Sequence, residues 1–188
     1  VHGSEIHMTA TELPDQGVVF WPVGTGDSTT IVVDGRHVLQ VDLRDQKAAT
    51  ADGAVVTAVI DRLAETLPTT SGGDRPYLSV FALTHGDFDH CAGFGRLLDS
   101  DILIGELWAT PRLWREYATE GEMCEDAKRF HKEANRRVKA TLEHVVAGRA
   151  VPSGDRIRVI GYDDDLYELD LAYAALPAEC ASFPGDAI

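Results

Sequence analysis

The chain has 188 residues, enough for one well-cored domain, and its 44% hydrophobic and 26% charged residues are typical of an ordinary globular protein. This composition excludes intrinsic disorder, collagen and coiled coil, and no apolar run approaches the roughly 20 residues of a membrane-spanning helix. The net charge of −14 leaves no broad basic surface, which disfavours tight binding to duplex DNA through its phosphates.

Strands dominate the first part of the chain. Residues 18–21, 29–33 and 37–41 are rich in β-branched and other apolar side chains. Asp34 and Gly35 separate the second run from the third and indicate a tight turn. We therefore expect a hairpin over residues 29–41.

Helices and strands alternate in the rest of the chain. Apolar residues at helical spacing predict helices over 52–67 and 121–146. In the second of these, one apolar stripe is expected to face the core: Met123, Ala127, Phe130, Ala134, Val138, Leu142 and Val145. Apolar runs predict further strands at 78–83, 102–108, 156–160 and 169–176. The fold class is therefore expected to be α/β or mixed α+β.

The strongest chemical signal is a run of four ligand-type side chains directly after the predicted strand 78–83. His85, Asp87, Asp89 and His90 are too closely spaced for one face of a helix or strand, so a loop must gather them. Imidazole together with carboxylate suits zinc, manganese or iron, and adjacent side chains can serve two neighbouring metals because they diverge. The alternative is a polar turn in which Asp89 caps the helix that begins near His90.

The segment from Thr84 to Gly93 (THGDFDHCAG) resembles the signature loop of the metallo-β-lactamase superfamily, HxHxDH followed closely by glycine, with Asp87 at the third position. This variant is similar to the branch that contains the hydrolase domain of bacterial competence (DNA-uptake) proteins and many soluble relatives. The stretch VGTGDS at 23–28, followed by a strand, a tight turn and a strand ending at Asp42, is similar to the opening pattern of the same branch.

The resemblance implies an αβ/βα sandwich of two mixed sheets, with helices outside and metals at one edge. It covers residues 18 to about 176, which correspond to the first half of that fold. Residues 8–188 are therefore expected to be the N-terminal part of such a domain. One half alone would expose an apolar sheet face, so we expect a complementing C-terminal half or second chain in a larger assembly.

The resemblance also assigns roles within the loop. His85 and Asp87 are implied to hold a first metal ion, and Asp89 and His90 a second, with zinc or manganese as the one or two cations. Asp89 is further implied to be the catalytic residue, because it orients the metal-bound hydroxide that attacks the substrate. The carboxylate of Asp87 makes the site more anionic and favours manganese alongside zinc. Asp42 is a candidate for orienting a metal-bound histidine.

Other chemistry-bearing residues have less specific patterns. His131 and His144 both fall in the predicted long helix and are expected to be packed or solvated there rather than to bind metal. Asp27 and Ser28 are expected to form a turn. Cys91 is expected to be a small buried apolar residue. The later ligands of the superfamily are thus missing from this sequence.

The expected function is that of a metal-dependent hydrolase acting on a phosphodiester, in a nucleic acid or a nucleotide. The alternative is a catalytically silent scaffold or sensor subunit that acts by binding a partner; the missing later ligands favour it, and the intact loop favours the enzyme. Three widely spaced cysteines favour reduced thiols and a cytoplasmic protein, and the lack of a long apolar run favours one with no membrane partner. Met8 is expected to be the natural first residue, with residues 1–7 foreign to the protein.

Overall fold

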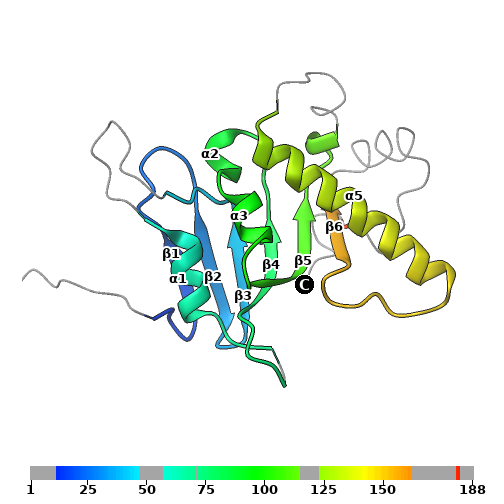
Figure 1. Ribbon diagram of the computed structural model, residues 1–188, viewed down its shortest axis with the longest axis horizontal. Helices are drawn as coiled ribbons and strands as arrows, with labels where there is room; N and C mark the ends of the chain where they lie inside the picture. Colours follow the sequence, from blue (N-terminus) through cyan, green and yellow to red (C-terminus); the bar gives the residue numbers. More distant parts are fainter. Residues whose placement is uncertain (1–11, 47–56, 71, 115–122, 162–180, 183–188) are drawn as a thin grey trace, which may run out of the picture.

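The computed structural model of the chain describes residues 12–46, 57–70, 72–114, 123–161 and 181–182 (Figure 1). These residues form a seven-stranded mixed sheet whose strands lie side by side in chain order. The strands are β1 Gly17–Phe20, β2 Thr29–Asp34, β3 His37–Val41, β4 Tyr77–Ala82, β5 Leu103–Ala109, β6 Arg156–Ile160 and β7 Ala181–Ser182. Neighbours from β1 to β3 are antiparallel, whereas neighbours from β3 to β7 are parallel. The predicted mixed α/β class is confirmed at this level.

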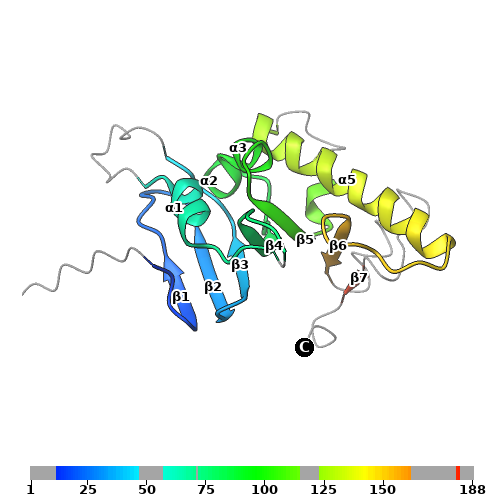
Figure 2. The same cartoon turned by 60° about the horizontal axis from the view of Figure 1, so that its bottom comes forward.

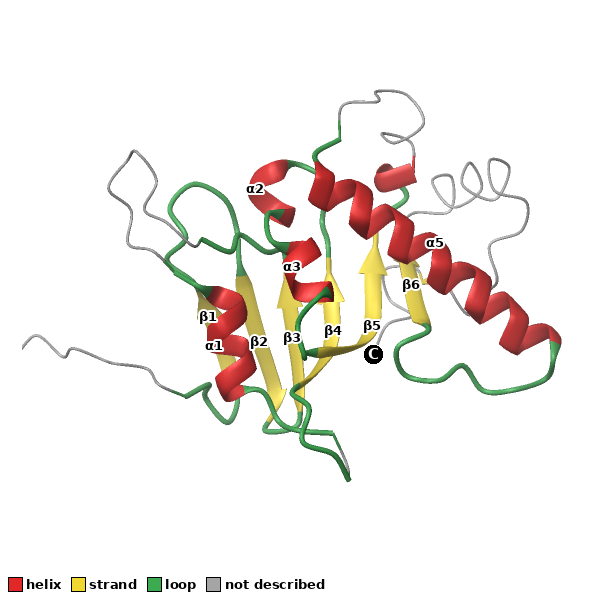
Figure 3. Ribbon diagram, viewed as in Figure 1, coloured by secondary structure: helices red, strands yellow, loops and turns green. Residues whose placement is uncertain are grey.

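Helices cover one face of this sheet in both views (Figures 1 and 2). They are α1 Val59–Thr66, α2 Phe88–Cys91, α3 Phe94–Leu98 and α5 Glu125–Val146. The short helix α2 lies at the edge of the sheet where β4 ends, and α1, α3 and α5 lie across the face (Figure 3). Within the described part of the chain, no helix has the length and apolar character needed to cross a membrane.

Three aromatic rings form the centre of the core between sheet and helices. Phe81 on β4 lies 5.0 Å, between ring centroids, from Phe94 on α3 and 5.9 Å from Phe130 on α5. Phe94 and Phe130 are 4.9 Å apart in an edge-to-face arrangement, and all three side chains are fully buried. These contacts join both helices to the central strand and so fix α2, which precedes α3, over the end of β4.

The opposite face of the sheet also carries apolar side chains. Since Phe81 points to the helices, Val80 points away from them, and so does its partner Leu39 on β3. The same register places Val18 and Phe20 of β1 on this face, with 51% and 77% of their surface exposed. The predicted strand at 169–176 lies outside the described residues, and the second sheet with its complementing half or second chain stays a prediction.

Both long predicted helices begin later in the structure than the periodicity indicates. Helix α1 starts at Val59, and residues 47–56 lie outside the described part. Helix α5 starts at Glu125 because Cys124 has an extended backbone, with ψ 161°, and its Sγ accepts a hydrogen bond from the Ala127 amide. Apolar periodicity predicts which residues are buried. Residues just before a helix can also be buried, so the pattern predicts a helix that starts too early.

The predicted apolar stripe of α5 is correct in its first half and wrong at its end. Ala127, Phe130 and Ala134 are fully buried, whereas Leu142 is 42% exposed. The last turns of α5 extend beyond β6, so no strand of the described residues lies beneath them to bury an apolar residue (Figure 1). Polar residues complete the buried face instead: His131, Arg137 and Thr141.

Buried His131 gives the protein a predicted sensitivity to acid. The side chain is 6% exposed, and burial lowers its pKa from the ordinary value near 6.5. The folded state therefore prefers the neutral ring, so stability is full above the ordinary pKa and is lost as the pH falls below it. We expect a His131→Phe variant to lose less unfolding free energy than the wild type between pH 7 and pH 5, in urea titrations. Equal losses in the two proteins would contradict this assignment, because all other titrating groups are shared.

Candidate metal centre

The predicted ligand loop and Asp42 lie at the same edge of the sheet because β3 and β4 are parallel neighbours. Asp42 directly follows β3, and the loop from Thr84 to His90 follows β4. Backbone hydrogen bonds join the two segments: the amide of Asp42 donates to the Ala82 carbonyl (2.8 Å) and that of Leu43 to the His90 carbonyl (2.7 Å). Parallel pairing thus brings together residues that are 48 positions apart.

Asp42 is the hub of the hydrogen bonds at this edge. It is 3% exposed and has φ 51°, the only positive φ of a non-glycine residue in the described part of the chain. Its Oδ1 accepts from the Thr84 amide (2.8 Å). Its Oδ2 accepts from the Thr84 hydroxyl (2.6 Å) and from Nδ1 of His90 (2.8 Å). A strained, buried carboxylate with three donors is built to hold His90 in one orientation.

This network assigns the tautomers of both loop histidines. The Thr84 hydroxyl donates its proton to Asp42, so its oxygen accepts from Nδ1 of His85 at 2.9 Å. Nδ1 of His90 donates to Asp42 in the same way. In its neutral form each ring therefore carries its proton on Nδ1 and has its lone pair on Nε2, where a metal can bind. The ring centroids are 3.8 Å apart.

Each free Nε2 has a carboxylate beside it. Nε2 of His85 is 3.3 Å from Oδ2 of Asp87, and Nε2 of His90 is 3.8 Å from Oδ2 of Asp89. The two histidine side chains are 21% and 14% exposed, whereas the aspartates are 61% and 46% exposed. The rings are thus held while the carboxylates remain accessible for a ligand. Each predicted carboxylate thus lies beside one ring, but neither Asp87 nor Asp89 belongs to the group of ligand atoms that the structure gathers within 4.8 Å of one another.

The atoms of Asp42, His85 and His90 that could bind a metal also lie within 4.8 Å of one another. Both oxygens of Asp42, however, already accept hydrogen bonds from Thr84 and His90. A metal on Asp42 would have to replace those bonds. Asp42 therefore orients His90, and the ring atoms of the cluster that remain available to a ligand are the two Nε2 atoms.

The structure adds Asp27 to this cluster, where the sequence predicted only a turn. Oδ2 of Asp27 is 3.7 Å from Nδ1 of His90, and the Asp27 amide donates to the Asp89 carbonyl (3.2 Å). Gly26, at φ 108°, makes this approach possible, because a Cβ there would lie 2.3 Å from the Asp89 carbonyl oxygen. In the sequence, the spacing of the glycines in VGTGDS indicates a turn. Only the tertiary structure shows that this turn lies against Asp89.

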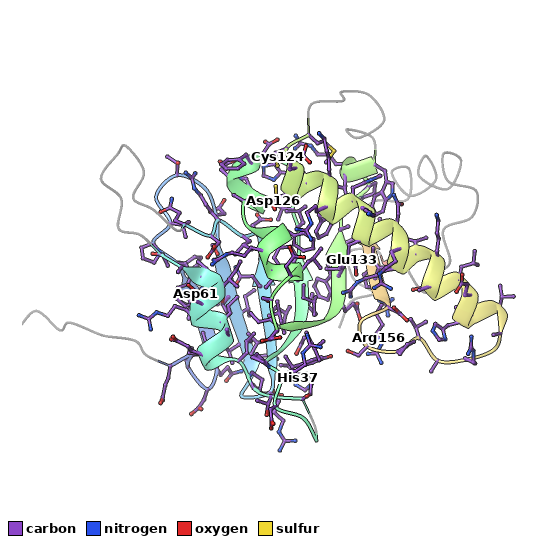
Figure 4. All side chains as sticks on the ribbon, in the orientation of Figure 1. His37, Asp61, Cys124, Asp126, Glu133 and Arg156 are labelled. Atoms are coloured by element: carbon purple, nitrogen blue, oxygen red, sulfur yellow. The ribbon has the colours of Figure 1, made fainter. Side chains whose placement is uncertain are left out.

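Two acidic side chains hold the segment after the loop. Asp126 on α5 accepts from the amides of Gly93 (2.9 Å) and Gly95 (2.7 Å) at the start of α3. Asp45, after β3, forms an ion pair with Arg96 of α3. Figure 4 shows Asp126 and Cys124 at the start of α5, beside α2 and α3. These two contacts hold the residues that follow the ligand loop, and the hydrogen bonds from Thr84 to Asp42 hold its start.

Cys91, next to His90, is fully buried as expected, and burial raises the pKa of its thiol. Its Sγ lies 3.3 Å from both the Asp87 carbonyl and Sγ of Cys124.

His131 is buried on α5 against Trp114, and Nε2 of His144 lies 3.6 Å from Asp155. Neither of these histidines belongs to the ligand cluster of the described residues.

Comparisons with known protein families, with curated proteins and with solved structures find no match to this chain.

Asp42→Ala is expected to weaken the binding of Mn²⁺ or Zn²⁺ about 10- to 100-fold, because His90 loses the acceptor that orients it. Isothermal titration of the metal-free protein measures this effect. Asp34→Ala is the matched control, since Asp34 also accepts from a histidine Nδ1, that of His37 at 2.9 Å, but at the hairpin turn between β2 and β3. An unchanged affinity in the Asp42 variant would contradict the orienting role.

Proposed function

We propose that this protein is a metal-dependent hydrolase that holds zinc or manganese at His85, Asp87, Asp89 and His90. The observation that carries the proposal is the pair of adjacent imidazoles whose Nδ1 atoms are both occupied. Fixing Nδ1 through a carboxylate or hydroxyl is the arrangement by which proteins present Nε2 to a metal. A polar turn without a ligand does not require it.

The donor set fits such a cation. Two neutral imidazoles and two accessible carboxylates suit Zn²⁺ or Mn²⁺. Asp27 and Asp42 add further negative charge around them. A bound cation would offset the electrostatic repulsion among these carboxylates, which nothing else in the described cluster offsets.

A divalent cation held by these residues would supply Lewis acidity, which would lower the pKa of a water molecule and polarise a substrate oxygen. In this proposal Asp89, which lies 3.8 Å from Nε2 of His90, would accept the proton of that water and orient it. Substrate phosphate would be repelled by the acidic loop alone, so binding of a phosphodiester depends on the cation. The phosphodiester itself is supported by the resemblance to the competence-protein branch of the metallo-β-lactamase superfamily.

The mixed sheet, with helices on one face and apolar side chains on the other, is compatible with the first half of an αβ/βα sandwich. This arrangement supports the superfamily relationship as part of the proposal. It also supports a complementing half or second chain on the apolar face.

Elemental analysis of protein purified without chelators tests the metal, and we expect on the order of one equivalent of zinc or manganese. His85→Ala and His90→Ala should abolish the binding, whereas His37→Ala, a histidine outside the loop, should not. Hydrolysis of bis(p-nitrophenyl) phosphate with added Mn²⁺ tests the activity. Metal binding without turnover would favour the scaffold or sensor subunit. Less than about a tenth of an equivalent, with no binding on titration, would overturn the metal site.

A further inference from the structure

Two thiols meet beside the ligand loop. Cys91 is the last residue of α2 and directly follows His90, and Cys124 is the N-cap residue of α5. Their sulfur atoms are 3.3 Å apart, although the residues are 33 positions apart in the chain. Both are free, Cys91 fully buried and Cys124 half-buried. Figure 4 shows Cys124 beside α2.

We propose that Cys91 and Cys124 are a redox modification site, which forms a reversible disulfide between α2 and α5 in response to peroxide. The contact of the two sulfurs is close enough that a small side-chain movement suffices for the bond. A packed pair of reduced cysteines would need only apolar contact. In this pair the sulfurs are 3.3 Å apart, and Cys124 is half-buried whereas Cys91 is fully buried.

The two-step chemistry follows from the difference in exposure. The sulfur of Cys124, the less buried of the two residues, attacks one oxygen of hydrogen peroxide as the thiolate; the O–O bond breaks, giving a sulfenic acid and one water after protonation. The sulfur of Cys91 then attacks the sulfur of Cys124, the S–O bond breaks and a second water leaves. The two thiols lose two electrons and two protons, which the peroxide takes up as two waters. A dithiol reductant reverses the bond by exchange.

Oxidation would act on the ligand loop through a hydrogen bond. The thiol of Cys91 donates to the carbonyl of Asp87 (3.3 Å) and lies 3.7 Å from that of Gly86. A disulfide removes this donor and draws the sulfur toward Cys124. The backbone that carries His85 and Asp87 then loses a contact, so we expect the oxidised protein to bind metal more weakly. This consequence rests on the proposed function, whereas the disulfide does not.

Mass spectrometry of the full chain tests the disulfide. The background is Cys180→Ser, because Cys180 lies outside the described residues. After treatment with hydrogen peroxide, we expect the loss of two hydrogens and a peptide that links Cys91 to Cys124, both reversed by dithiothreitol. Cys124→Ser and Cys91→Ala should each prevent the link. The serine hydroxyl can replace the Cys124 sulfur as the N-cap acceptor. Separate oxygen additions without a link, or links only between chains, would overturn the proposal.

Titration with Mn²⁺ tests the coupling, because manganese prefers oxygen and imidazole ligands to thiolates and so does not report on the cysteines themselves. We expect an affinity about tenfold lower in the oxidised protein, and no effect of peroxide in the Cys124→Ser variant. Equal affinities would overturn the coupling while the linked peptide stands. Absence of binding in both forms would overturn the proposed metal site and the coupling. The disulfide proposal would still be supported by the linked peptide.

Discussion

Replacing Asp89 by alanine is expected to lower kcat/KM for phosphodiester hydrolysis roughly a thousandfold, which corresponds to about 4 kcal/mol of activation free energy. The carboxylate lies 3.8 Å from Nε2 of His90 and is proposed both to bind the metal and to aim the attacking water. Its side chain is 46% exposed, so folding should be little affected. Steady-state kinetics with added Mn²⁺ and thermal melts of the same samples measure both quantities.

Asp74→Ala is the control for Asp89→Ala, because it removes the same charge from an exposed turn before β4, at the opposite edge of the sheet. His131→Ala and His144→Ala should also keep their activity, since both residues lie on α5 outside the ligand cluster. The reverse pattern would contradict the site: normal turnover in the Asp89 variant, with activity lost on changing His131 or His144.

Replacing Arg137 by alanine is expected to destabilise the fold by about 3–5 kcal/mol, because several buried backbone carbonyls lose their donor and each unsatisfied group costs about 1–3 kcal/mol. The guanidinium is 3% exposed and donates to Glu133 of its own helix at 2.8 Å. It also donates to the backbone carbonyls of Ile104, Gly105 and Arg156, at 3.1–3.3 Å. These bonds fasten α5 to β5 and β6, and their acceptors would be left buried without a donor.

Arg136→Ala is the matched control, because the neighbouring arginine has a half-exposed side chain and pairs with Glu133 and Asp155 at the surface. It should cost about 1 kcal/mol or less. Chemical denaturation of both variants gives the comparison. Similar losses in the two would contradict a special role for the buried guanidinium.

The sequence predicted many of the local elements. The hairpin over 29–41 is found as β2 and β3, since the β-branched run at 29–33, the turn at Asp34 and Gly35 and the apolar residues at 37–41 are all local signals. The strand before the ligand loop is found as β4, one residue earlier than predicted. In each case the information lies in neighbours two or four positions apart, which sequence periodicity reports directly.

Helix faces were predicted less well where the tertiary structure changes what lies beneath them. Leu142 was expected in the core but lies on turns of α5 that extend past the sheet, whereas Arg137, a residue type expected in solvent, is buried. Periodicity shows that a helix has a buried side, but not which neighbour each turn meets.

By itself, the sequence determined which residue types gather after β4, because His85, Asp87, Asp89 and His90 are adjacent in the chain. Only the tertiary structure decided how these residues are held. The bond from His90 to Asp42, the approach of Asp27 and the contact of Cys91 with Cys124 all join distant segments. Such contacts are set by the parallel pairing of β3 with β4 and by the packing of α5, and neither interaction leaves a periodic pattern in the residues that it brings together.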